Sequence, residues 1–167
     1  DALRQLSSQQ RKGKHHFVMK SSGRLLEKFP NSSEVYNVLG SSQFALGLLD
    51  EAIESFKKSL EIRPQDETTY NNIALALAGC GHSELARQGF EMALSIKPDF
   101  IVARRNLADL EHEQGETAQA ITNYKKCIFS CPDDPITHHN LGHTLASVGE
   151  FDQAIEAYRK ALKLNKN

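Results

Sequence analysis

The chain has 167 residues, of which 40% are hydrophobic and 25% are charged, values typical of a globular protein with a packed core. No apolar run approaches the roughly 20 residues that a transmembrane helix needs, and a net charge of -1 argues against a nucleic-acid-binding protein. The three cysteines, Cys80, Cys127 and Cys131, do not form a disulfide framework, so we expect reduced thiols and a cytoplasmic location.

The charges are unevenly distributed along the chain. Residues 1–30 carry seven Lys and Arg against two Asp and Glu, whereas residues 31–167 carry thirteen against nineteen. The start is polar and lacks the apolar segment of a secretory signal. Because the chain begins at Asp1 and ends with no polar helix to cover Ala157 and Leu162, we expect a fragment of a longer protein.

Prolines and glycines recur along the chain with a period of 34 residues. The two series are Pro30, Pro64, Pro98 and Pro132, and Gly13, Gly47, Gly81, Gly115 and Gly149. Small and aromatic residues keep the same phase, as Ala52, Ala86, Ala120 and Ala154, and as Phe56, Phe90, Tyr124 and Tyr158. A fixed period of this length indicates a repeat protein, in which stacked neighbours bury a continuous core.

In chain order, the predicted elements are a degenerate first unit at 1–32 and four full units at 33–66, 67–100, 101–134 and 135–167. The first unit keeps Gly13 and Pro30 but places Gly23 inside its second helix, at a cost of roughly 0.8–1 kcal/mol relative to alanine. We expect this unit to act as a cap, because the terminal repeats of a stack need a polar outer face.

Each full unit is expected to fold as two helices. Between Pro64 and Gly81, apolar side chains recur at helical spacing, and the glycine ends this helix in the left-handed conformation. The second helix ends before Pro98, because proline has no N–H to donate and restricts the residue before it. The expected helices are 33–46, 50–63, 67–80, 83–96, 101–114, 117–130, 135–148 and 151–165.

On these residues the chain resembles the tetratricopeptide repeat proteins, whose 34-residue helix–turn–helix unit has small residues, an aromatic and a terminal proline at the same offsets. Tyr36 and Tyr70 keep the aromatic near the start of a unit, whereas Arg104 and His138 replace it. The resemblance implies an all-α, right-handed superhelical solenoid of antiparallel helix pairs. It also implies a concave groove, lined by the helices that follow the prolines.

Three asparagines on the expected concave face, Asn72, Asn106 and Asn140, recur with the period, and Val38 interrupts the series. A side-chain amide both donates and accepts, so such a series can hold the backbone of an extended peptide. The series resembles the asparagine ladder of O-linked N-acetylglucosamine transferases, which holds protein substrates. The alternative is that the asparagines bond helices within the scaffold. The other candidate peptide contacts are Asn37, Asn71, Arg105, Asp109, His139 and His143.

Other kinds of site are not expected. Arg105 stands without a second cation, so the carboxylate clamp of chaperone-binding family members is absent. His139 and His143 lie four residues apart but lack a third ligand and a second shell, so we expect solvated histidines rather than a metal site. Cys127 occupies a small core position and is expected to be a packed thiol. No nucleophile, phosphate-loop or dinucleotide motif is present, so neither catalysis nor a cofactor is expected.

The sequence therefore predicts a protein–protein interaction scaffold whose groove binds a peptide segment of a partner, with no nucleic-acid or membrane partner. A second hypothesis is the substrate-recruiting region of a larger transferase, because the stretch LLEKFPNSSEVYNVLG is similar to the start of bacterial proteins that join such repeats to sulfotransferase or glycosyltransferase domains. A third is self-association through the uncovered terminal helices at Ala157 and Leu162.

Overall fold

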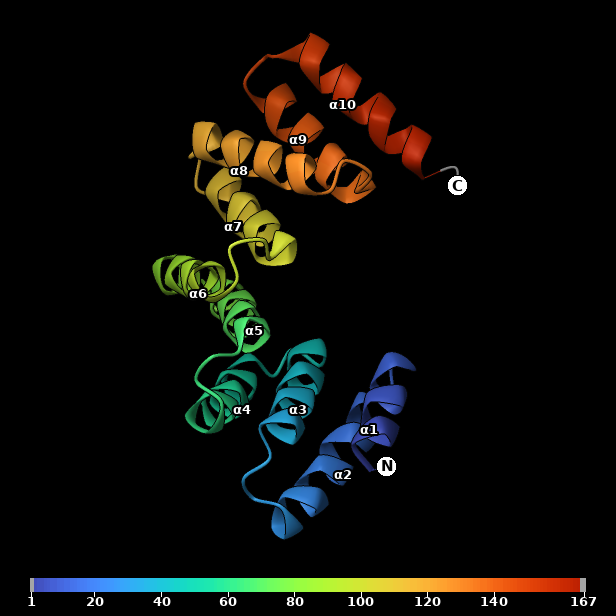
Figure 1. Cartoon of the computed structure of the whole chain (residues 1–167), viewed down its shortest axis with the longest axis vertical. Helices are drawn as coiled ribbons and strands as arrows, with labels where there is room; N and C mark the ends of the chain where they lie inside the picture. The colour runs from blue at the N-terminus through green and yellow to red at the C-terminus, as the bar shows by residue number, and fades with distance from the viewer. Residues whose placement is uncertain (1, 166–167) are drawn as a thin grey trace. The chain divides into compact units, whose positions relative to one another are not determined.

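The computed structural model describes residues 2–165, which form ten α-helices and no β-strand (Figure 1). The helices are α1 (Ala2–Arg11), α2 (His15–Lys28), α3 (Ser33–Ala45), α4 (Leu49–Ile62), α5 (Glu67–Gly79), α6 (Ser83–Ile96), α7 (Ile101–Glu113), α8 (Thr117–Ser130), α9 (Pro135–Ser147) and α10 (Phe151–Leu164). The eight helices predicted after residue 32 are confirmed, with every bound within one residue. None of the described helices has the length and apolar character needed to span a membrane.

The chain divides into two compact units, which are each larger than a 34-residue repeat. The first unit is Asp1–Ile96 with helices α1–α6, and the second unit is Lys97–Asn167 with helices α7–α10. In the first unit α3 packs on α4 and α5 on α6, while α2 contacts α3 and α4 contacts α5. In the second unit α7 packs on α8 and α9 on α10, and α8 contacts α9. Successive helices run in opposite directions within each pair (Figure 1), so the predicted antiparallel helix pairs are confirmed within each unit.

Glycine forms the turn inside each helix pair. The five periodic glycines have φ between 70° and 82°, in the left-handed region that other residues adopt only with strain. At Gly81 the backbone N–H donates to Ala78 O at 2.9 Å, which closes the end of α5 and allows α6 to begin at Ser83. The predicted role of these glycines as helix ends is confirmed.

The core of each unit is built from the aromatic and small residues of the 34-residue series. Phe56, Phe90 and Tyr124 are each 1% exposed, and the alanines four residues before them are fully buried. Large and small residues face each other: a Cβ added to Gly40 would lie 2.7 Å from Phe56 Cε1. The Phe56 ring therefore occupies the space that a side chain at position 40 would need, which lets α3 and α4 pack closely.

Arg104 and His138, which replace the usual aromatic, share one role in the second unit. Arg104 Nη2 donates to Pro98 O at 2.6 Å, and His138 Nε2 lies 2.8 Å from Pro132 O. Each side chain thus reaches the carbonyl of the proline six residues earlier. These contacts connect the first turns of α7 and α9 to the loops that precede the two helices.

The last helix pair differs from expectation at Ala157, which is buried, whereas Leu162 is 63% exposed. Ala157 lines a hollow with Ile128 and Leu141 instead of facing outward with Leu162. Five residues along a helix correspond to a rotation of about 500°, so the two side chains point about 140° apart. The expected self-association surface therefore does not include Ala157.

Candidate peptide-binding groove

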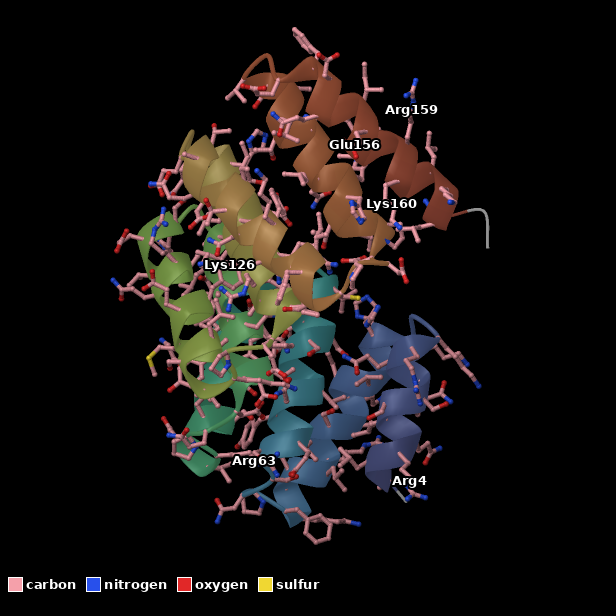
Figure 2. All side chains as sticks on the ribbon, turned by 45° about the horizontal axis from the view of Figure 1, so that its top comes forward. Arg4, Arg63, Lys126, Glu156, Arg159 and Lys160 are labelled. Carbon is pink, nitrogen blue, oxygen red and sulfur yellow. The ribbon has the colours of Figure 1, made fainter. Side chains whose placement is uncertain are left out.

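The first unit carries an open polar groove of about 550 Å³ between α1, α3 and the start of α5. Arg63, labelled in Figure 2, lies in its wall after the end of α4. Most of the lining consists of hydroxyl and amide side chains, namely Ser7, Gln10, Ser33, Asn37, Ser41, Gln65, Thr68 and Asn72. Such a lining offers hydrogen-bond donors and acceptors together.

Two of the predicted contacts, Asn37 of α3 and Asn72 of α5, meet in this groove. Asn72 Nδ2 donates to Asn37 Oδ1 at 3.3 Å, and Asn37 Nδ2 donates to Thr69 Oγ1. Both asparagines are half-buried, so part of each amide faces the groove. The bonds between them hold the two amides in fixed positions on neighbouring helices.

Asn71, also predicted as a contact, lies beneath the groove instead of on its surface. It is 4% exposed, and its Nδ2 donates to Asn72 Oδ1 at 3.4 Å. The lining of the groove includes Asn72 but not Asn71. Asn71 therefore supports Asn72 from the interior.

The acidic residues of the groove are committed to partners within the unit. Glu34 Oε1 accepts from Arg63 Nη2 at 2.9 Å, and hydrogen bonding from its own backbone N–H together with Arg63 holds the pKa of Glu34 below its usual value. Asp66 Oδ1 accepts from the N–H groups of Thr68 at 3.0 Å and Thr69 at 3.2 Å, which caps α5. The groups left to a ligand are therefore mainly amides and hydroxyls.

In the second unit, the predicted contact residue Arg105 forms an internal ion pair. Arg105 Nη1 lies 2.8 Å from Asp134 Oδ2, with side chains 18% and 16% exposed. Asp134 also caps α9, accepting from Ile136 N at 3.2 Å and Thr137 Oγ1 at 2.5 Å. Burial raises the pKa of Asp134, but the Thr137 hydrogen bond and Arg105 more than offset it, so the pKa is lowered. Arg105 thus holds α7 to the start of α9.

Asp109 is likewise engaged within the second unit. Asn140 Nδ2 donates to Asp109 Oδ1 at 2.8 Å, and Tyr124 OH donates to the same oxygen. Burial and the adjacent Asp109 carboxylate raise the pKa of Tyr124, which keeps the phenol neutral and able to donate. These bonds join α7, α8 and α9. Asn106 is half-buried on α7, three residues before Asp109.

The predicted series of asparagines is divided between the units, with Asn72 in the first and Asn106 and Asn140 in the second. In each unit one of them bonds a side chain of a neighbouring helix, Asn72 to Asn37 and Asn140 to Asp109. The alternative role considered above, bonding within the scaffold, therefore describes these contacts. The half-buried position of both asparagines leaves them a role toward a ligand as well.

The two candidate histidines are exposed on α9 and make ring contacts. The His139 ring lies 5.5 Å from that of Tyr158, and the His143 ring meets His112 edge-on at 5.1 Å. In the part of the chain that the structure describes, no three His, Cys, Asp or Glu side chains are grouped as a metal site. Both histidines present an imidazole to solvent.

The residues that cap the helices are not among the contacts predicted from the sequence. Asp66 and Asp134 stand two periods apart, and each is followed three residues later by a threonine, Thr69 or Thr137. This pairing of an acidic cap with a threonine is a signal that the sequence contains. Ser7 and Gln10 of α1 line the groove but give no such signal, because they lie in the degenerate N-terminal repeat at 1–32.

Models of known families match more than half of the chain. The tetratricopeptide repeat model matches residues 33–66 and 135–167, and a second model, described as TPR repeat, matches residues 108–149. No curated protein sequence matches the chain.

Solved structures match nearly the whole chain. MamA 41-end from Desulfovibrio magneticus RS-1 is 18% identical with a TM-score of 0.82, covering 99% of this chain and 96% of that one. TTC0263, a thermophilic TPR protein of Thermus thermophilus, is 22% identical with a TM-score of 0.82, covering 98% and 89%. YrrB, a TPR protein with an unusual peptide-binding site, is 16% identical with a TM-score of 0.73, covering 99% and 86%. At these identities the similarity shows the fold alone, an all-α solenoid of antiparallel helix pairs.

Proposed function

The chain belongs to the tetratricopeptide repeat family, and we propose that it binds an extended peptide segment of a partner protein in the groove of its first unit. Membership of this family supports the general interpretation as a protein–protein interaction scaffold. The observation that carries the finer proposal is the bonded pair of half-buried amides, Asn37 and Asn72, in the groove wall.

An extended peptide brings a backbone N–H and C=O at every residue, and each group loses water when the peptide binds. The amides of Asn37 and Asn72 and the hydroxyls around them supply both acceptors and donors. Thr69 and Asn71 already hold the amides in place, which reduces the entropy lost on binding. Recognition of this kind depends on the peptide backbone more than on its side chains.

The second unit carries the other residues predicted as peptide contacts. Arg105, Asp109 and Asn140 bond to groups of their own unit and hold its helices together. His139 and His143 are exposed on α9, so they remain proposed contacts of this unit. Asn106, half-buried on α7, is the proposed backbone contact of this unit.

YrrB, which shares the fold, has a peptide-binding site, so peptide binding is a function that this arrangement of helices can perform. If the chain recruits substrates for a transferase domain of a larger protein, the same groove would hold the substrate peptide. A cytoplasmic location, argued from the three free cysteines, fits either case.

The test begins with peptides selected from a random phage-displayed library on the full chain. The dissociation constant of a selected peptide is then measured for the full chain and for Asn72→Ala, Asn72→Asp and Lys57→Ala. Loss of one ligand hydrogen bond corresponds to about 0.5–1.5 kcal/mol, so Asn72→Ala should weaken binding several-fold. Lys57, exposed on the outer side of α4 and paired with Glu54 at 2.8 Å, is the control and should leave the affinity unchanged. Unchanged affinity in both Asn72 variants would contradict the proposal.

A further inference from the structure

Phe129 of α8 is the most exposed large hydrophobic side chain in the described part of the chain, at 89%. The residues one or two periods away are Glu61, Ser95 and Lys163, all polar. Each of the other full 34-residue repeats therefore has a polar residue at this position. A phenylalanine here contributes nothing to the core of its unit, and a ring this exposed gains stability when another molecule covers it.

The Phe129 ring borders a hollow of about 620 Å³ on the second unit, between the start of α7 and α8. Three cations, Arg104, Lys125 and Lys126, line this hollow, against one acidic residue, Asp99. Arg104 is held in place by its bond to Pro98 O at 2.6 Å.

The two lysines of the hollow are exposed on α8, where Figure 2 labels Lys126. Neither Lys125 nor Lys126 pairs with a carboxylate of the residues that the structure describes. The equivalent lysine Lys57 of α4, by contrast, is paired with Glu54 at 2.8 Å. The hollow thus joins unpaired positive charge to an uncovered aromatic ring.

We propose that this hollow binds an acidic segment of a partner protein, at a surface separate from the groove of the first unit. An aromatic or aliphatic side chain of the segment covers Phe129, and carboxylates beside it pair with Lys125, Lys126 and Arg104. Charge complementarity selects an acidic occupant, because cations outnumber the single carboxylate of the hollow. A nucleic acid fits less well, since nucleic-acid-binding surfaces belong to strongly basic domains and the whole chain has a net charge of -1.

The probe for this surface is a capped, fluorescently labelled peptide with one phenylalanine between two pairs of glutamates. Its binding to the full chain is measured by anisotropy beside two counterparts, one with glutamines for glutamates and one with serine for phenylalanine. Only the acidic aromatic peptide should bind well, and added salt should weaken it. The hollow and the groove lie in different units, so Asn72→Ala should leave binding of this probe unchanged. Binding of the probe is expected even if the groove of the first unit binds no peptide.

Phe129→Ser, which introduces the residue found at the equivalent position in α6, and the double variant Lys125→Gln with Lys126→Gln should each weaken the probe about tenfold. All three residues are exposed, so the melting temperature should not change. The matched control is Lys57→Gln with Lys58→Gln, at the same repeat positions of α4, where Glu61 stands in place of Phe129. This control should bind the probe as the unaltered chain does.

Three results would overturn the assignment. The first is equal binding of the glutamine counterpart, and the second is an equal loss in the α4 control. The third is binding of a single-stranded oligonucleotide or a phosphatidylserine vesicle that exceeds binding of the acidic peptide and is abolished by Phe129→Ser. In that case the hollow would serve phosphates or lipid instead of protein carboxylates.

Discussion

Asn140 donates its side-chain amide to Asp109 Oδ1 at 2.8 Å, and the phenol of Tyr124 donates to the same oxygen. This carboxylate therefore joins three helices of the second unit at a half-buried site. In the first unit, Asn72 instead bonds a neutral partner, Asn37, over 3.3 Å. Two asparagines that stand two periods apart thus differ in what they contribute to stability.

The two contacts predict different effects of the same substitution. A hydrogen bond to a charged group contributes about 1.5–3 kcal/mol and a neutral one about 0.5–1.5 kcal/mol. Asn140→Ala should therefore lower the free energy of unfolding more than Asn72→Ala, as measured by urea denaturation. A larger loss for Asn72→Ala would show that the asparagine of the first unit is mainly a scaffold residue.

The ion pair between Arg105 and Asp134 predicts a specific loss of stability in acid. Because the pKa of Asp134 is lowered in the folded chain, its contribution is present above the unfolded pKa and is lost as the pH falls through the folded pKa. Arg105→Ala should reduce the free energy of unfolding at neutral pH and have a much smaller effect at a pH below the folded-state pKa of Asp134.

Asp134→Asn serves as the companion measurement. It keeps an N-cap for α9 but removes the titrating group, so its free energy of unfolding should fall less steeply in acid than that of the unaltered chain. An equal loss at every pH for Arg105→Ala would mean that the guanidinium acts by packing alone.

Two glycines in helices predict opposite effects of alanine. Gly40→Ala would bring a Cβ to 2.7 Å from Phe56 Cε1, and overpacking of this kind costs about 1–3 kcal/mol. Gly23→Ala in α2 meets no atom within 4 Å and should stabilise the chain by up to about 1 kcal/mol through helix propensity. Thermal unfolding of the two variants checks the sign of each effect, and a stabilising Gly40→Ala would refute the close packing of α3 on α4.

Cysteine labelling tests the core of the second unit. Burial raises the pKa of Cys127 to about 11, and its Sγ lies 3.8 Å from Ile101 O. Iodoacetamide should therefore modify the half-buried Cys80 and Cys131 first, since the thiolate is the reactive form. Mass spectrometry should find Cys127 modified only after unfolding in guanidinium. Rapid native labelling of Cys127 would indicate frequent opening of α8.

The helix bounds can be predicted from the sequence because the residues that end the helices act locally. A glycine at positive φ ends the first helix of each pair, and a proline ends the second, so periodic Gly81 and Pro98 locate helix bounds without knowledge of packing. The side chains of the site depend on tertiary contacts instead. Arg105 is drawn to Asp134 from another helix, and Asn71 is turned inward by one helical step from Asn72. Neither outcome is encoded in the spacing of the repeat.

The most direct test of the proposed function is an NMR titration of the isotope-labelled full chain with a selected peptide, following side-chain amide signals. We predict that the Asn37 and Asn72 side-chain signals shift in proportion to the bound fraction, together with backbone signals of Ser41 and Thr68 in the same groove. The amide signal of Asn123, bonded to buried Glu111 in the second unit, should stay in place. Shifts confined to the second unit, with the Asn37 and Asn72 signals unchanged at saturation, would contradict peptide binding in this groove.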